Sequence, residues 1–258
     1  MGCIGMNGKK REYLYASIDD DVMKADRQLI PVYTNFFNLA EQKIVEKFLN
    51  KYDSIKYSKL GGYGHAERCI FCIYSVFIDY DISHYTPIKV LAISWDERYY
   101  EIGHRDVLGA ILGLGIKRDV VGDIIIDEDI AHVFVLEDIS KFILKYLIKV
   151  GSAPVNVECF NTGEVEVKGP DIKLLKAVIP SSRLDCLTSA GFGVSRSKSV
   201  TMIKSGRVMV NWEVCTKPSY DIEPGDIITI RGRGRIRYKG IIRRTKKEKL
   251  FVEIERYI

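Results

Sequence analysis

The sequence lacks the segments that mark membrane and secreted proteins. No stretch approaches the ~20 uninterrupted apolar residues that a membrane span needs. The first eleven residues contain no continuous apolar run of the kind found in signal peptides. The six cysteines are scattered, which is typical of free thiols in a reducing compartment and not of a disulfide framework, at positions 3, 69, 72, 159, 186 and 215. We therefore expect a cytoplasmic protein that has no contact with a membrane.

Complete catalytic and metal-binding signatures are also missing. His104-Arg105-Asp106 resembles a kinase catalytic loop, but Ile111 stands where that loop needs a metal-binding Asn, and no Asp-Phe-Gly follows. Cys69 and Cys72 have the spacing of a metal-binding pair, but no second pair accompanies them. We predict a non-catalytic protein with no cofactor and no metal.

Positive charge is concentrated at one end of the chain. Residues 181–258 contain 17 Lys and Arg against 8 Asp and Glu, a net charge of +9. Residues 1–180 contain 22 basic and 26 acidic residues, a net charge of −4, so the overall +5 hides a strong asymmetry. A basic segment of this kind predicts a polyanionic partner for the C-terminal end.

Apolar periodicity predicts an α+β protein. Helices are expected within residues 18–50, beginning near Asp19 and interrupted by Pro31, with a capping box formed by Asn38 and Glu41. From residue 88 the order is strand, helix, strand, strand, helix, strand, with helices over 106–116, capped by Asp106, and 138–150. This is the ferredoxin-like order, which RNA-recognition motif domains also use.

The 258 residues are enough for three parts. We predict a helical N-terminal region over 1–68, a ferredoxin-like middle domain over 69–165 and a small, basic α+β domain over 178–258. In the middle domain, Phe134 lies where a recognition motif could present a stacking aromatic. The basic and glycine residues of that signature are absent, so we predict that Phe134 belongs to the core.

The C-terminal part begins with a predicted pair of short helices. Ser182 is expected to cap a helix over 183–190 that ends at Gly191, and Ser195 to cap a helix over 196–205 that ends at Gly206. The pair is basic, through Arg183, Arg196, Lys198 and Lys204. Serine hydroxyls at 195 and 197 and the helix start at Ser195 are suited to phosphate oxygens.

A second basic stretch follows at positions 231–239. Arg231, Arg233, Arg235, Arg237 and Lys239 recur at every second residue. In an extended strand all five side chains would point to one face, where phosphates could neutralise their mutual repulsion. The alternative is a solvated basic tail, but the apolar run at 250–254 predicts a strand that folds this segment into a sheet.

Several blocks resemble the RNA-binding domain named after ribosomal small-subunit protein four. They are Ser182-Arg-Leu-Asp-Cys-Leu187, Gly193-Val-Ser-Arg-Ser-Lys198, Ile203-Lys-Ser-Gly-Arg-Val-Met-Val-Asn211, Lys217-Pro-Ser219 and Gly225-Asp-Ile-Ile228. The resemblance implies that the helix pair and the turn after it face RNA. The predicted RNA-binding residues are Arg183, Asp185, Ser195, Arg196, Ser197, Lys198, Lys204, Arg207, Asn211, Lys217, Arg231, Arg233, Arg235 and Arg237.

Other blocks resemble the bacterial YlmH family over residues 31–258. They are Thr34-Asn-Phe-Phe-Asn-Leu-Ala-Glu-Gln42, Gly61-Gly-Tyr-Gly-His-Ala-Glu-Arg68, and residues 104–124. The first departs from the usual pattern at Asn35 and Ala40. The resemblance implies large-subunit ribosomal RNA, tRNA and ribosome-associated quality-control factors as partners, and a role at stalled ribosomes. We expect a monomer, with possible secondary RNA contacts at Arg68, His104 and Arg105.

Two alternative functions remain at this point. Arg183-Leu-Asp185 also resembles the block in which pseudouridine synthases carry their aspartate nucleophile, so Asp185 could belong to an RNA-modifying enzyme. In those enzymes a large catalytic domain follows the RNA-binding domain, whereas here the predicted RNA-binding fold fills the rest of the chain. The other alternative is a scaffold protein whose RNA-binding domain is incidental.

Overall fold

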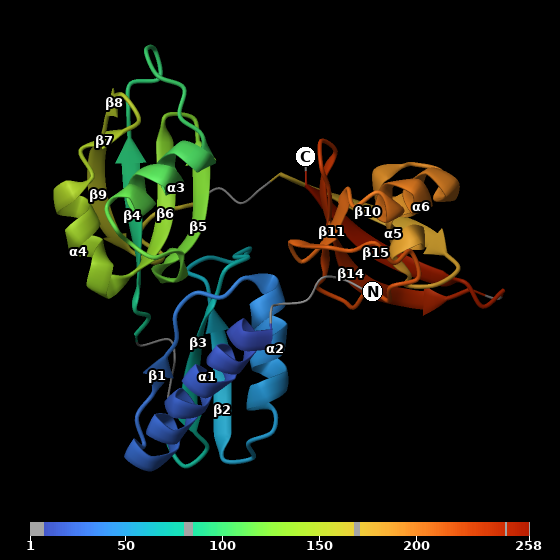
Figure 1. Ribbon diagram of the computed structural model, residues 1–258, viewed down its shortest axis with the longest axis horizontal. Coiled ribbons are helices and arrows are strands. Elements are labelled where there is room, and N and C mark those ends of the chain that lie inside the picture. The colour runs from blue at the N-terminus through green and yellow to red at the C-terminus, as the bar shows by residue number, and fades with distance from the viewer. Residues whose placement is uncertain (1–7, 80–84, 168–170, 246, 258) are drawn as a thin grey trace. The chain divides into compact units, whose positions relative to one another are not determined.

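The computed structural model describes residues 8–79, 85–167, 171–245 and 247–257. The chain forms two compact units, one of residues 11–169 and one that comprises residues 170–258 (Figure 1). Both combine helices with antiparallel sheets, which confirms the predicted α+β class. No helix among the described residues is both long and apolar enough to cross a membrane.

The N-terminal part of the first unit packs two helices on a small sheet. The elements are α1 (Gly8–Gln28), β1 (Val32–Tyr33), α2 (Leu39–Leu49), β2 (Ile55–Leu60) and β3 (Ile70–Ser75), and the strand order is β1-β3-β2. The predicted capping box of α2 is confirmed, because the Asn38 side chain accepts from the Glu41 amide and the Glu41 carboxylate from the Asn38 amide. Ile18 and Val22 of α1 pack with Val45 and Phe71 in the core.

Two sequence-based expectations for this part were wrong. Helix α1 already includes Gly8, so Asp19 lies in its middle and not at its start. Asp19 has a tertiary role, since it accepts a hydrogen bond from the Tyr52 hydroxyl, and this bond raises the pKa of Tyr52 to about 12. Strand β3 pairs with β1 and β2, although residues 69–165 were expected to form the middle domain. An apolar run identifies a buried strand but does not specify its partner.

The middle part has the ferredoxin-like order that the sequence predicted. Its main elements are β4 (Ile88–Ser94), α3 (His104–Gly113), β5 (Val121–Asp127), β6 (Ile130–Leu136), α4 (Glu137–Tyr146) and β9 (Asn156–Asn161). The strands form an antiparallel sheet in the order β5-β6-β4-β9. Helix α3 packs against β5, and α4 packs against β4, β6 and β9. A short 3-10 turn, η1 (Arg118–Val120), precedes β5.

The limits of both helices of the middle domain, α3 and α4, differ from the predicted ones. Asp106 is not the N-cap of α3, which is Gly103, but its carboxylate accepts a hydrogen bond from the Gly103 amide at 2.9 Å. Helix α4 ends at Tyr146 and not at 150. The residues after it form a hairpin of β7 (Lys149–Val150) and β8 (Ala153–Pro154), whose turn contains Gly151 at φ +59°.

The second unit is a six-stranded antiparallel sheet with two short helices. Its strands are β10 (Ile172–Ile179), β11 (Val208–Val210), β12 (Glu213–Val214), β13 (Ile227–Ile230), β14 (Gly234–Arg244) and β15 (Leu250–Tyr257), in the order β10-β15-β14-β13-β11-β12. Helices α5 (Leu184–Phe192) and α6 (Arg196–Lys204) pack against each other, and α5 contacts β10 and β14. Strand β10 begins before residue 178, where we expected this domain to start.

The limits of α5 differ from the prediction, whereas α6 has the predicted cap. Arg183, not Ser182, occupies the N-cap position of α5, and Gly193 at φ +65° ends the helix. Gly191 lies inside the helix, where a Cβ atom would come within 2.3 Å of the Ile236 side chain. Gly191 therefore allows close packing of α5 on the sheet. For α6, the Ser195 hydroxyl accepts from the Lys198 amide at 3.3 Å, as expected.

The prediction that five basic side chains share one strand face was wrong. Strand β14 starts at Gly234, so Arg231 and Arg233 lie in the turn between β13 and β14. Gly232 at φ +76° and Gly234 at φ +87° adopt left-handed conformations that break the extended chain. Of the five, only Arg235, Arg237 and Lys239 lie on the strand itself.

Candidate nucleic-acid interface

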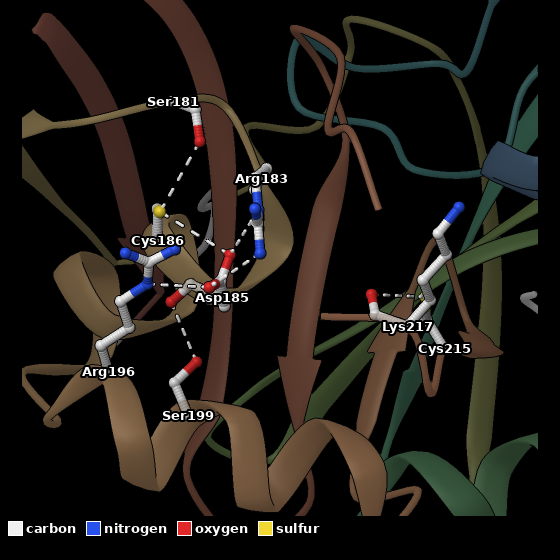
Figure 2. A network of polar contacts seen from close by, with 8 residues as sticks. All are labelled: Ser181, Arg183, Asp185, Cys186, Arg196, Ser199, Cys215 and Lys217. Carbon is white, nitrogen blue, oxygen red and sulfur yellow. Dashed lines mark hydrogen bonds and ion pairs between the residues drawn. The ribbon is translucent and has the colours of Figure 1, made fainter. Parts of the chain in front are cut away.

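The buried carboxylate of Asp185 holds two arginines at the start of the helix pair (Figure 2). It accepts hydrogen bonds from Arg196 Nε at 2.8 Å and from Arg183 Nε at 3.1 Å. The Asp185 side chain is only 2% exposed, whereas those of Arg183 and Arg196 are 38% and 54% exposed. One carboxylate thus fixes two guanidinium groups at the surface and leaves a local net charge of +1. Fixed donors lose less conformational entropy when they bind an anion.

Asp185 is ionised in this arrangement. Burial alone would raise the pKa of its carboxyl group, but the hydrogen bond from Arg196 and the charges of Arg183 and Arg196 outweigh burial, and the pKa is lowered. Its main-chain atoms join three elements, since its amide donates to Pro218 O at 3.0 Å and its carbonyl accepts from the Ser199 hydroxyl at 3.0 Å. Asp185 is therefore a positioning residue for the basic groups around it.

The first turn of α6 extends this basic surface. Arg196, Ser197 and Lys198 are all exposed, and the Ser195 and Ser197 hydroxyls lie 3.1 Å apart. The first amides of a helix point outward and carry partial positive charge, which favours a phosphate or another anion. We call Arg183, Ser195, Arg196, Ser197 and Lys198 the α5–α6 surface.

Other predicted residues form a second basic group. Lys204 and Arg207 are exposed at the end of α6, and the Arg231 amide donates to Arg207 O at 3.2 Å. This bond brings Arg207 next to the exposed turn that contains Arg231 and Arg233. Lys217 is exposed in the turn after β12, but its side chain points away from Asp185 (Figure 2).

Arg235 and Arg237 lie on the other face of the sheet. Between them, Ile236 points toward Gly191 of α5, so its neighbours on the strand point away from the helices. Arg237 and Lys239 both pair with Glu255, at 3.8 Å and 3.2 Å. The arginines that the sequence joined into one stretch are therefore divided between a turn and a strand.

Asn211 lies inside the fold. It is 7% exposed, its side-chain amide donates to Asp226, and its carbonyl oxygen accepts from the Ile227 amide at 2.9 Å. These bonds hold the hairpin between β11 and β12 against β13. We therefore exclude Asn211 from the proposed contact residues.

Arg68 also has an internal role. Its guanidinium donates to the carbonyl oxygens of Phe36 and Val121 at 3.0 Å each, and its amide donates to Asp123 at 3.1 Å. It thereby joins the N-terminal part to the middle domain, so we exclude it from the proposed contacts. His104 and Arg105 are exposed on the first turn of α3 and stay predicted secondary contacts.

The sheet face that recognition-motif domains offer to RNA is covered in the middle domain. Phe134 on β6 is fully buried, and its ring stacks on that of Tyr63 at 4.9 Å between centroids. Gly122 on β5 lies so close to Phe36 that a Cβ atom would come within 2.8 Å of that ring. Phe36 and Ile70 of the N-terminal part share a core cluster with Val90 and Phe134. The prediction that Phe134 belongs to the core is confirmed.

Cys69 and Cys72 are both buried in the fold, and burial raises the pKa of Cys72 to about 11. Within the part of the chain that the structure describes, no three His, Cys, Asp or Glu side chains are grouped to hold a metal ion.

Comparison with known proteins identifies the family. Residues 83–164 match the family model described as "Putative RNA-binding domain in YlmH", and residues 183–228 match the "S4 domain". The chain is 31% identical over 223 residues to "Ribosome-associated protein quality control protein P2" of Bacillus subtilis (strain 168), which covers 86% of each chain. The chain belongs to the YlmH family. The resemblances seen in the sequence are thus confirmed.

Two further comparisons agree with this YlmH-family assignment. The solved structure of "Cell division protein ylmH from Streptococcus pneumoniae" matches with a TM-score of 0.51 and 21% identity, over 64% of this chain and 100% of that one, which shows a common fold. The "Small ribosomal subunit protein uS4" of Coxiella burnetii (strain RSA 493 / Nine Mile phase I) is 41% identical over 64 residues, 24% of this chain and 31% of that protein.

Proposed function

We propose that this YlmH-family protein is a non-catalytic RNA-binding protein that contacts ribosomal RNA of the large subunit and its tRNA. On this proposal it acts with ribosome-associated quality-control factors on stalled ribosomes. The observation that carries the proposal is the α5–α6 surface, where a buried carboxylate fixes two exposed guanidinium groups beside a helix start. The name of the Bacillus subtilis relative, a ribosome-associated quality control protein, supports the ribosomal setting.

The charge of the domain supports RNA over a neutral partner. The net charge of +9 within residues 181–258 would give sequence-independent attraction to a phosphate backbone. Ordered arginines and serines on one surface would then set the orientation of the RNA. Most of the binding energy on this proposal is electrostatic and therefore sensitive to salt.

The position of Asp185 favours binding over catalysis. A nucleophile must reach its substrate, but the Asp185 carboxylate is 2% exposed and occupied by two guanidinium groups. We infer that Asp185 organises the RNA-binding surface. An RNA-modifying enzyme that uses Asp185 would need both arginines to move aside.

Salt-dependent co-sedimentation with purified large ribosomal subunits tests the proposal. The Arg196→Gln/Lys198→Gln variant removes two charges from the α5–α6 surface. We expect weaker binding and a slope of log affinity against log salt that is smaller by about 2, because roughly one counterion is released per phosphate contact. Adding deacylated tRNA to the same assay tests whether tRNA increases the bound fraction.

The matched control is Lys247→Gln/Lys249→Gln, which removes the same charge from exposed positions in the β14–β15 loop. The control variant should change the slope of log affinity against log salt by less than half as much as Arg196→Gln/Lys198→Gln does. Equal losses in the two variants would show that total charge matters and not the α5–α6 surface. Wild-type protein that stays in the supernatant at low salt would refute the proposed function altogether.

A further inference from the structure

A strained hairpin exposes a tryptophan on the C-terminal domain. Val210 of β11 pairs with Glu213 of β12, so the loop between the strands consists of Asn211 and Trp212 alone. Both loop residues have positive φ, +49° and +71°, as a type I′ turn requires. Asn followed by Gly is the favoured pair for this turn. Asn211 fits its position, but a large L side chain at the second position is costly.

Trp212 is not buried in the core in return for this strain. Trp212 is 41% exposed, whereas the other tryptophan of the chain, Trp95, is 7% exposed. Trp212 is also absent from the core cluster of its domain. A large aromatic residue held in an unfavourable backbone conformation while it stays this exposed suggests a functional role for the side chain.

The surroundings of Trp212 are cationic and aromatic. The Arg235 guanidinium carbon lies 5.8 Å from the centre of the Trp212 ring and 4.4 Å from that of Tyr257. Arg237 lies 5.8 Å from the Tyr257 ring. These contacts place the Arg235 guanidinium near two aromatic rings. Arg231 and Arg233, which are both exposed, lie just before Arg235 in the chain.

An exposed indole beside an ordered arginine is suited to an unpaired nucleobase. Aromatic rings and guanidinium planes stack on bases that are free of a duplex, and neighbouring arginines bind the adjoining phosphates. Arg235 lies on the sheet face opposite the helices, because Ile236 points toward α5. This contact would therefore be separate from the α5–α6 surface. The basic surroundings favour RNA over a protein partner, which would use the same aromatic residue type.

We propose that Trp212, together with Arg235, is a stacking site for an unpaired RNA base. The proposal rests on the proposed RNA-binding function and adds to it the kind of RNA feature that is recognised. The ligand then contains a bulged or looped-out nucleotide in addition to the backbone that the α5–α6 surface contacts.

The decisive variant is Trp212→Gly in the full chain. Glycine accepts φ +71° without strain, so the melting temperature should stay equal or rise. The probes are an RNA hairpin with one unpaired adenosine in its stem and the same hairpin fully paired. We expect Trp212→Gly to weaken binding of the bulged hairpin by about 5- to 150-fold, which is the usual contribution of one stacked base to affinity. Binding of the paired hairpin should stay nearly unchanged. Trp212→Phe should restore part of the loss.

Fluorescence gives an independent readout. With Trp95→Phe, Trp212 is the only tryptophan, and stacking should quench its emission on addition of the bulged hairpin but not of the paired one. Equal affinity of wild type and Trp212→Gly for the bulged hairpin, or an equal loss for both hairpins, would overturn the stacking site. Arg196→Gln/Lys198→Gln should weaken both hairpins. Wild-type protein that binds neither hairpin would contradict the proposed function itself.

Discussion

The middle and C-terminal domains use their sheets in opposite ways. Both are small α+β folds with two helices on one face of an antiparallel sheet. In the middle domain the second face is covered by apolar groups of the N-terminal part, with Phe134 fully buried. In the C-terminal domain the second face carries Arg235 and Arg237, and Trp212 is exposed beside Arg235.

The comparison teaches that element order does not decide which face binds a ligand. The middle domain has the strand order of a recognition motif, yet the face that such motifs use is occupied by its own chain. What distinguishes the two domains is the chemistry of their side chains, apolar in one and cationic in the other. Four substitutions can break or sharpen this contrast.

The largest effect is expected for Phe134→Ala. Removing a fully buried aromatic ring should lower the free energy of unfolding of the first unit by about 3–5 kcal/mol. RNA affinity should be unchanged at temperatures where the variant is folded, because this ring is covered. Denaturant unfolding and hairpin binding measure the two quantities. A loss of RNA affinity without a loss of stability would mean that the sheet face opens and stacks on bases.

Asp185→Asn should give an intermediate effect in the C-terminal domain. We expect a loss of about 1.5–3 kcal/mol at pH 7, the usual range for hydrogen bonds to charged groups. The carboxyl pKa is lowered in the folded state, so its stabilisation is present above the ordinary value of 3.8 and disappears as the pH falls through the folded pKa. The stability difference between wild type and variant should therefore shrink in acid.

Urea unfolding between pH 7 and pH 3 checks this prediction. A pH-independent difference would argue against an ionised Asp185 that pairs with Arg183 and Arg196. The same variant should leave no RNA-modifying activity to lose. Uridine isomerisation by wild type that vanishes in Asp185→Asn would support the enzyme alternative.

The smallest effects come from a matched pair of helix caps. Asn38→Ala and Ser195→Ala each remove a side-chain cap, and each should cost about 1 kcal/mol of stability. Only Ser195→Ala should also weaken RNA binding, by a few-fold, because Ser195 lies in the α5–α6 surface. Thermal unfolding and hairpin titration distinguish the two losses. Equal RNA affinities in both variants would remove Ser195 from the proposed contacts.

Local patterns in the sequence predicted much of the fold. The capping residues Asn38 and Ser195 and the strand that includes the apolar run at 250–254 stand where their patterns placed them, because each depends on neighbours in the chain. The sequence pattern predicts a helix end at Gly191, because it does not reveal that Ile236 packs against this residue. Partners distant in sequence, such as β1 and β3, are likewise beyond what local periodicity can predict.

The candidate site was predicted in part. Charge and motif identified Arg183, Arg196 and Lys198, which lie together at the surface. The alternation of basic residues at 231–239 predicts one shared face only if the chain is extended there. The positive φ angles of Gly232 and Gly234 show that it is not. Trp212 was missed because no sequence rule expects a tryptophan in a left-handed turn.

The position of β15 has a consequence for the order in which the C-terminal domain can form during synthesis. Strand β10 is made first, but all eight of its residues pair with residues of β15, which also borders β14. Until residues 250–257 have been translated, β10 has no neighbour in the sheet and β14 has an open edge. An open edge can pair with another chain. A polypeptide arrested just before residue 250 would thus carry a nearly complete but unclosed domain.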